Sequence, residues 1–319
     1  MTARRHPVVR LVLMRVLASA VVLVGVTFVV FWGIDRAPGD PATAVLGPFA
    51  TEQQRAAYIE ANGLDDPMPV RFVRFIGDLS QGQLGRSATR PTDASALVAE
   101  AAPVTIQLTA TALLLAAVLG VAVGIIAAAR QGGGADRVIR LGTSVTLAAP
   151  DFWVGLVAIQ VFAVVLGWLP SGGYRPWSAG PLDWLTHMAM PATVLALPLA
   201  AALANQVRSA MTQELDRDYV RSARGAGIAP ARVFGSAFRN AATGPLTVLG
   251  LRASYLLSGA IVVEQIFNLP GLGTLLIQGV RQGDLAVTRA VALLGTIGIL
   301  VVSLVLDLLY LALNPKART

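Results

Sequence analysis

Apolar segments of roughly 20 residues or more alternate with polar stretches along the whole chain. A helix needs about 20 apolar residues to cross the hydrocarbon core of a bilayer. Pro150 interrupts the third segment, and the part before it, residues 138–149, is too short to cross, so we predict a single kinked span there. The pattern therefore predicts six membrane-spanning helices, over residues 16–34, 104–128, 139–168, 189–207, 246–266 and 287–313.

Basic residues gather in alternate connections between these segments. The N-terminal arm carries four arginines, residues 129–140 three, and residues 208–240 six, whereas residues 169–188 and 267–286 carry one each. Basic connections stay on the cytoplasmic side of a membrane. We therefore predict that both termini are cytoplasmic in the cell membrane. The first apolar segment is too long for a signal peptide and has no small-x-small cleavage site before Asp35, which indicates an uncleaved anchor.

The segment between the first two spans is long and polar, and helical periodicity appears over residues 52–61 and 69–79. We interpret it as a small external segment. The expected organisation is an arm and first helix over 1–34, an external segment over 35–103, and a five-helix core over 104–319 with a cytoplasmic loop at 208–242. The predicted fold class is an all-α integral membrane protein with six transmembrane helices.

Composition narrows the function. The chain is 55% hydrophobic and 13% charged, whereas soluble domains carry about 25% charged residues. The net charge of +7 is spread over several loops, which argues against a nucleic-acid-binding face. The one lysine, Lys316, follows Pro315, so no G-x-x-x-x-G-K-[ST] phosphate loop exists. The sequence also lacks cysteine, an H-E-x-x-H helix and a G-x-S-x-G serine, so we expect neither an ATPase site nor catalytic residues nor a metal site.

The stretch "DYVRSARGAGIAPARVFGSAFRNA", residues 218–241, is unusually polar for this chain. Gly227 suits the left-handed end of one helix, and Pro230 suits the first turn of the next. We predict a helix, a sharp turn and a second helix at the cytoplasmic face, acting either as a lipid-surface pair or as a docking element. The second helix should bury Val233, Phe234, Ala237, Phe238 and Ala241, and the first, more weakly, Tyr219, Ala223 and Ala226.

This stretch resembles the cytoplasmic coupling loop of ABC-importer permeases, which in the peptide branch reads D-Y-V-R-x-A-R-x-x-G. Residues Ala237–Asn240 depart from the I-x-L-P ending of the general motif. Other segments resemble the same branch from about residue 10 to 318. The matching loop positions are Asp218, Tyr219, Val220, Arg221, Ala223, Arg224 and Gly227. The further similar segments are "PGDPA" at 38–42, "NGLDDPMPVRFVRFIGDLSQGQLGRS" at 62–87, "PDFWVG" at 150–155, "VEQIFNLPGLG" at 263–273 and "DLLYLALNP" at 307–315.

The resemblance implies a B-type permease subunit of a dipeptide, oligopeptide or nickel importer. It implies a second homologous permease, two cytoplasmic ATPase subunits that bind ATP and Mg, and an external substrate-binding protein. The loop, with Pro230 and Arg232 included, would insert into a cleft of the ATPase. A nickel or other small-solute importer remains an alternative. So does an ATP-independent secondary transporter or channel, which should show broken helices in both halves of the chain.

Several residues outside the loop are candidates. An acid at membrane depth is costly unless it is paired or wetted, so Asp151, between Pro150 and Phe152, either lines the translocation path or partners backbone freed by Pro150. Glu264, at the outer end of the fifth span, is expected to fix the following Pro-Gly turn or to contact the partner permease, rather than to contact substrate. With Pro270, Gly271 and Gly273 it forms a group to which we assign a structural or gating role. Asp307 is expected to have a structural role, and it either pairs with Arg252 or leaves that arginine to snorkel.

Overall fold

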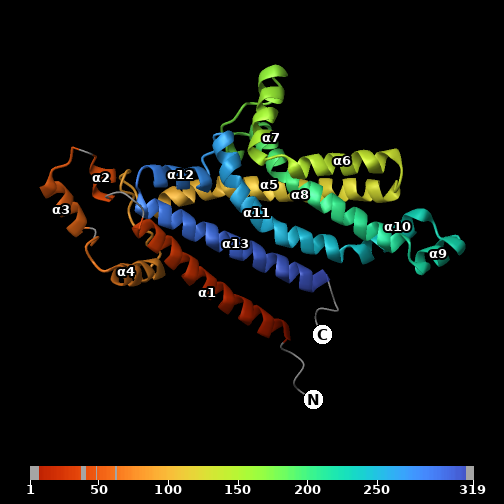
Figure 1. Cartoon of the computed structure of the whole chain (residues 1–319), viewed down its shortest axis with the longest axis horizontal. Helices are drawn as coiled ribbons and strands as arrows, with labels where there is room; N and C mark the ends of the chain where they lie inside the picture. Colours follow the sequence, from red (N-terminus) through yellow and green to blue (C-terminus); the bar gives the residue numbers. More distant parts are fainter. Residues whose placement is uncertain (1–6, 37–40, 48, 62, 314–319) are drawn as a thin grey trace, which may run out of the picture. The chain divides into compact units, whose positions relative to one another are not determined.

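The computed structural model describes residues 7–36, 41–47, 49–61 and 63–313 (Figure 1). Helices dominate these residues, and their only β pairing is an isolated bridge between Arg86 and Asp93. The chain forms two compact units. The first unit comprises Met1–Ile106 and Leu269–Leu300, and the second comprises Gln107–Asn268 and Val301–Thr319.

The first unit contains the expected helices 52–61 and 69–79, seen as α3 and α4. The helices α2 and α12 were not predicted; α12 lies within what we took for a loop, at the turn before the last span. The core of this unit joins the start of α5 to α12 and to the start of α13, through Ala94, Leu97, Val98, Ala101, Leu275, Val287, Ala290 and Val291. The helices of the first unit, with α5 and α13 belonging to it only in part, are α1 (Pro7–Asp35), α2 (Pro41–Leu46), α3 (Glu52–Ala61), α4 (Met68–Ser80), α5 (Ala94–Ala129), α12 (Leu272–Arg281) and α13 (Leu285–Leu313).

A buried carboxylate organises the turn between α12 and α13. Asp284 precedes α13, and its Oδ1 accepts a hydrogen bond from the Val287 N–H at 3.2 Å, which caps the helix. Its Oδ2 accepts bonds from Ser87 Oγ at 2.5 Å, the Ala88 N–H at 3.2 Å and Thr89 Oγ1 at 3.1 Å. One side chain therefore holds the loop residues 87–89 against the start of α13.

The second unit is built around α8 (Pro181–Leu215), which contacts α6, α7, α10 and α11. Its remaining elements are α6 (Gly134–Ala148), α7 (Asp151–Ala158), a π-helical stretch (Ile159–Val165), a 3-10 turn (Trp177–Ala179), α9 (Asp218–Gly225), α10 (Pro230–Ala241) and α11 (Thr243–Ile266). The predicted fourth span, 189–207, is shorter than α8 at both ends. At its C-terminal end, α8 continues through polar residues into the predicted loop.

Two glycines let α5 approach α8 closely. A Cβ at Gly120 would lie 2.8 Å from Leu203 Cβ and 2.9 Å from the Ala200 carbonyl oxygen. A Cβ at Gly124 would lie 2.6 Å from Val207 Cβ and 2.7 Å from the Ala204 carbonyl oxygen. The G-x-x-x-G spacing places both glycines on one face of α5, so the two backbones pack without intervening side chains.

By length and composition, four described helices can cross a membrane: α5, α8, most of α11 as Gly244–Ile266, and Leu285–Val305 of α13. The pair α6 and α7, with its π-helical continuation, makes a fifth candidate, and α1 contributes a shorter apolar stretch, Leu17–Gly33. The helical membrane fold is as predicted, while the count of six spans stays a prediction.

The third predicted span differs from our expectation of a single kinked helix. The helices on either side of Pro150 are bent by 106°. Both Ala149 (ψ 131°) and Pro150 (ψ 136°) have extended backbone. A residue before proline is pushed out of the helical region, so two consecutive extended residues end α6 outright and α7 begins in a new direction.

Candidate functional site

The turn between α9 and α10 has the geometry that the sequence predicts. Gly227 has a φ of 73°, its N–H donates to the Arg224 carbonyl at 3.1 Å, and the Ile228 N–H donates to the Ala223 carbonyl at 3.1 Å. These two bonds form a Schellman motif, which requires the left-handed conformation at Gly227. Pro230 then starts α10 at a position where its missing N–H costs nothing.

The apolar stripe of α10 is also as predicted. Val233, Ala237 and Ala241 are buried, and Phe234 and Phe238 pack partly buried against the same cluster. Figure 1 shows α10 alongside the end of α8, with α9 beyond it. The cluster joins α10 to the end of α5 and to Leu203, Val207 and Met211 of α8. The second helix of the segment is therefore seated on the helical core, with Arg232 and Arg239 exposed.

The stripe that we predicted for α9 is wrong. Val220 is its buried residue, with 0% of its surface exposed, whereas Tyr219 is 38% exposed and Ala226 is also exposed. The reason is a hydrogen bond. The Tyr219 hydroxyl donates to Glu214 Oε2 at 3.1 Å, and this contact rotates α9 so that Val220 turns inward. A helix of eight residues is too short for its periodicity to resist such a contact.

Glu214 links the end of α8 to both short helices. Besides Tyr219, it pairs with Arg217, whose Nε lies 3.0 Å from Glu214 Oε1. Asn240 of α10 donates from Nδ2 to the Tyr219 hydroxyl at 3.2 Å. Glu214 and Asn240 were not among the predicted site residues. Their partners are set by the three-dimensional packing of α8, α9 and α10, and no motif or periodicity in the sequence pairs them.

The remaining loop residues form an exposed polar face. The residues Asp218, Arg221, Arg224, Gly227, Pro230 and Arg232 are all exposed, and Ala223 is partly buried. An ion pair on this face, between Arg221 and Asp218 at 3.6 Å, is open to solvent on both sides and is of the kind that adds little to stability. The arginines therefore stand free to meet an acidic or polar partner surface.

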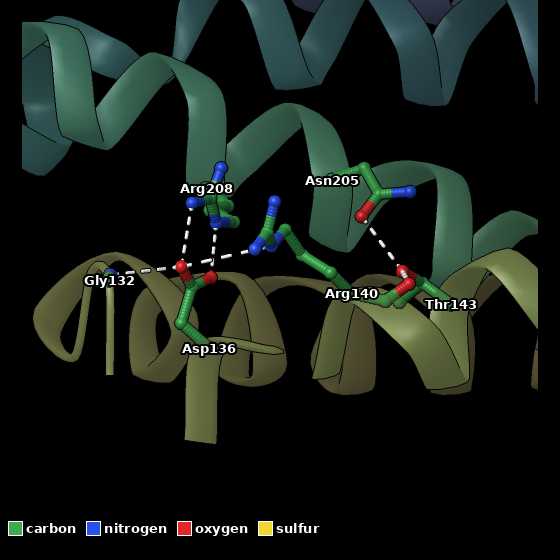
Figure 2. Close-up of polar contacts among 6 residues, drawn as sticks. All are labelled: Gly132, Asp136, Arg140, Thr143, Asn205 and Arg208. Carbon is green, nitrogen blue, oxygen red and sulfur yellow. Dashed lines mark hydrogen bonds and ion pairs between the residues drawn. The ribbon is translucent and has the colours of Figure 1, made fainter. Parts of the chain in front are cut away.

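A second polar cluster joins α6 to α8 (Figure 2). Asp136 is 1% exposed and accepts from both Arg208 Nε at 2.5 Å and Arg208 Nη2 at 2.8 Å. The Gly132 N–H also donates to Asp136 at 3.1 Å, and Arg140 Nε lies 3.8 Å away. This bidentate geometry is the strong form of the arginine–carboxylate pair.

Neighbouring residues extend the link. Thr143 Oγ1 donates to Asn205 Oδ1 at 2.9 Å, which gives α6 and α8 a second polar contact beside the Asp136–Arg208 pair (Figure 2). Sequence reasoning assigned Arg208 to the loop and overlooked Asp136. The i,i+4 spacing of Asp136 and Arg140 on a helix was the available signal.

The candidate translocation-path residues lie at the break between α6 and α7. Pro150 precedes the first turn of α7. Asp151 is partly buried on the side of α11, and its Oδ2 lies 3.9 Å from the position that a Cβ would take if Gly259 carried one. Phe152 is 52% exposed. Within the described residues, no backbone group donates to the Asp151 carboxylate, so the alternative role as a partner for the backbone near Pro150 has no contact to support it.

The other predicted residues fall into two places. Glu264 is fully buried near the end of α11, and the carbonyl of the following Phe267 accepts from the Gly173 N–H at 2.8 Å. In the first unit, Pro270 is exposed, whereas Gly271 and Gly273 are buried at the start of α12. There the Leu272 N–H donates to Thr105 Oγ1 at 2.8 Å.

Asp307 lies in α13, but its side chain is outside the described residues, so the pair with Arg252 stays a prediction.

Comparison with known proteins gives matches along almost the whole chain. A family model described as binding-protein-dependent transport system inner membrane component matches residues 120–319, and a model of the N-terminal part of such membrane components matches residues 8–109. The probable peptide ABC transporter permease protein y4tP of Sinorhizobium fredii is 32% identical over 308 residues, covering 96% of this chain and 98% of the relative.

Two further relatives are similar over the same length. The oligopeptide transport system permease protein AppB of Bacillus subtilis is 35% identical over 309 residues, covering 96% of this chain and 98% of the relative. The glutathione transport system permease protein GsiC of Salmonella paratyphi A is 35% identical over 308 residues, with the same coverage of 96% and 98%. The range matched by the first family model, residues 120–319, includes the α9–α10 segment.

Proposed function

The chain belongs to the family of binding-protein-dependent transport system inner membrane components, and from this membership we propose that it is the permease subunit of an ATP-driven importer of di- or oligopeptides. The names of the relatives support the cargo: they are described as permeases for peptides, oligopeptides and glutathione, which is itself a short peptide. The observation that carries the coupling role is the exposed arginine-bearing face of α9 and α10, whose opposite face is buried on α8.

The proposed assembly places this chain beside a second, homologous permease. Two ATPase subunits dock on the cytoplasmic side and hold ATP and Mg, and a substrate-binding protein delivers cargo from outside. Both termini then lie in the cytoplasm, in agreement with the distribution of arginines between the loops. In this assignment the chain has no ATPase site of its own, because its single lysine does not belong to a phosphate-binding loop.

The contacts around α8 suggest how closure of the ATPases reaches the membrane helices. A force on α9 and α10 passes to the end of α8 through the buried stripe of α10 and through Glu214, Tyr219 and Asn240. From α8 it passes to α6 through Arg208 and Asp136. The break at Pro150 lies at the far end of α6, so a tilt of α6 moves the start of α7, where Asp151 faces α11.

Changing Gly227 to valine is expected to uncouple ATP hydrolysis from peptide uptake. A Cβ at Gly227 meets nothing within 4 Å, so the change adds no clash, but the φ of 73° disfavours any β-branched residue by about 1–2 kcal/mol. The turn then shifts and α9 loses its angle to α10. Uptake of labelled dipeptide and ATP hydrolysis, measured together in proteoliposomes holding the complete importer, should show fewer peptides moved per ATP.

Gly82 offers a matched control for this experiment. Its φ is 76° and a Cβ there also meets nothing within 4 Å, so Gly82→Val introduces the same strain in the first unit. This control should leave the number of peptides moved per ATP unchanged. Gly227→Asn should also stay close to wild type, because asparagine tolerates the left-handed region. Equal loss of coupling in Gly82→Val and Gly227→Val would contradict a special role for the α9–α10 turn.

The importer itself is tested by omitting its ATPases. Vesicles holding the two permeases, the ATPases and the binding protein should accumulate labelled dipeptide only when ATP and Mg are present on the ATPase side. Vesicles without the ATPases should accumulate none. Accumulation that persists without ATPase, or that follows an ion gradient instead, would replace the proposal with a secondary transporter or a channel.

A further inference from the structure

A basic pocket of about 260 Å³ lies in the first unit, among the end of α1, the helix α4, residues 83–88 and the start of α13. Four arginines line it, namely Arg71, Arg74, Arg86 and Arg289, against a single carboxylate, that of Asp78. Two of them are paired with carboxylates beside the pocket, Arg74 with Asp66 at 2.7 Å and Arg86 with Asp93 at 3.5 Å. The positive charge that an anion in the pocket could meet therefore lies chiefly on Arg289, with Arg71 close by.

Arg289 is the lining arginine whose buried N–H donors lack hydrogen-bond acceptors. Its guanidinium lies 4.1 Å from the ring centroid of Phe31, and its Nε and Nη2 are buried without a hydrogen-bond partner in the part of the chain that the structure describes. The neighbouring arginines already have acceptors: Arg71 Nη1 donates to the Leu64 carbonyl at 2.9 Å, and Arg74 Nη2 donates to Asp66 at 2.7 Å. Buried donors without acceptors are rare in folded proteins, so Arg289 is suited to an anion entering the pocket.

Arg71 adds a second positive charge on the same aromatic ring. Its guanidinium lies 5.8 Å from the centroid of Phe31, so both cations contact one ring by cation–π geometry. Burial lowers the pKa of Arg71, yet an arginine stays protonated at neutral pH. An anion in the pocket would accept from the buried donors of Arg289 and would lie close to the charge of Arg71.

The pocket lies where apolar helices end. Phe31 is near the end of the apolar stretch Leu17–Gly33 of α1, and Arg289 is near the start of the candidate span Leu285–Val305 of α13. Ends of membrane-spanning helices lie at the level of lipid headgroups. Phe31 and Arg289 also border a smaller, mainly apolar hollow with Val26, Val30 and Leu293 on the membrane side.

We propose that this pocket binds the phosphate headgroup of an anionic phospholipid, with Arg289 as its principal ligand and Arg71 in a supporting place. The acyl chains would lie along the apolar surfaces of α1 and α13, where Val26 and Val29 are exposed. Because Arg289 has buried donors without an acceptor and the lining holds a single carboxylate, a headgroup with net negative charge is favoured over a zwitterionic one, whose ammonium group would be repelled. A bound lipid of this kind would fasten α4 to α1 and α13.

The test is lipid binding to the complete importer, purified in mild detergent and stripped of endogenous lipid. Native mass spectrometry counts bound phosphatidylglycerol, with phosphatidylcholine of the same chain length, inorganic phosphate and a dipeptide as separate probes. Wild type should retain phosphatidylglycerol in preference to phosphatidylcholine. Arg289→Gln should weaken that binding about tenfold, the loss expected when a charge-assisted contact is removed, and Arg71→Gln should weaken it less.

Arg281→Gln is the matched control, because Arg281 is an exposed arginine of α12 in the same unit and does not line the pocket; it should bind lipid as wild type does. Should Arg289→Gln fail to fold, Arg289→Lys keeps the charge but loses the planar fork, and it should bind phosphatidylglycerol with intermediate affinity. Equal binding in wild type and in the Arg289 and Arg71 variants would overturn the proposal. Binding of the dipeptide or of inorganic phosphate at this pocket, without phosphatidylglycerol, would overturn it as well.

Discussion

Replacing Arg208 with methionine is expected to lower the free energy of unfolding, because it leaves the Asp136 carboxylate, which is shielded from solvent, without its bidentate partner. Asp136 is 1% exposed and receives two hydrogen bonds from the Arg208 guanidinium. The contacts that remain, from the Gly132 N–H at 3.1 Å and from Arg140 at 3.8 Å, are too few or too distant to replace it. Thermal unfolding in mild detergent, followed by tryptophan fluorescence, measures the loss.

Two further variants separate this ion pair from general effects of removing an arginine. The double variant Asp136→Asn, Arg208→Met should recover much of the stability, since no charge is then buried alone. Arg221→Met removes an arginine whose ion pair is exposed on both sides, so its unfolding should change by no more than about 0.5 kcal/mol. If the double variant is as unstable as the single one, the charge of Asp136 is not the cause.

The second large effect is expected from Gly124→Ala, a change of one methyl group. The new Cβ would lie 2.6 Å from Val207 Cβ and 2.7 Å from the Ala204 carbonyl oxygen. A backbone oxygen has no rotamer by which to move away, so α5 and α8 must separate, at a cost of about 1–3 kcal/mol or more for overpacking. The same unfolding assay should show a lower midpoint, and less of the protein should elute as a single species from a sizing column.

Gly295→Ala is the control for this prediction. Gly295 lies in the α13 span, and a Cβ there meets nothing within 4 Å. Alanine favours a helix over glycine by about 1 kcal/mol, so this variant should be as stable as wild type or slightly more stable. The two substitutions are chemically identical and have opposite expected signs. A loss of similar size in both would show that the contact between α5 and α8 is looser than the structure describes.

The α9–α10 segment shows where sequence reasoning succeeds. Gly227, Pro230 and the stripe from Val233 to Ala241 are local features, set by backbone preference and by the period of a helix. They were predicted without reference to the rest of the chain. In α9 the same method failed, because Glu214 of the preceding helix determines the direction of Tyr219. A single contact from outside the element was enough to move Val220 into the core.

The roles of individual residues divide in the same way. The position of Pro150 at a helix boundary follows from proline chemistry. The pairing of Asp136 with Arg208, 72 residues apart, does not follow from any motif. Neither does the basic pocket, whose lining comes from four separated parts of the chain. Long-range polar partners of this kind are chosen by packing, which local patterns do not encode.

The apolar segments, the basic loops between them and the resemblance to the permease family could be read from the amino-acid sequence, because span length, charge bias and turn chemistry are local quantities. Which faces of the helices meet became known from the three-dimensional packing. In an apolar chain nearly every face of a helix is hydrophobic, so its periodicity does not mark the buried side. The close contact of Gly124 with α8, the 106° break at Pro150 and the burial of Asp136 beside Arg208 are therefore properties of the packed molecule.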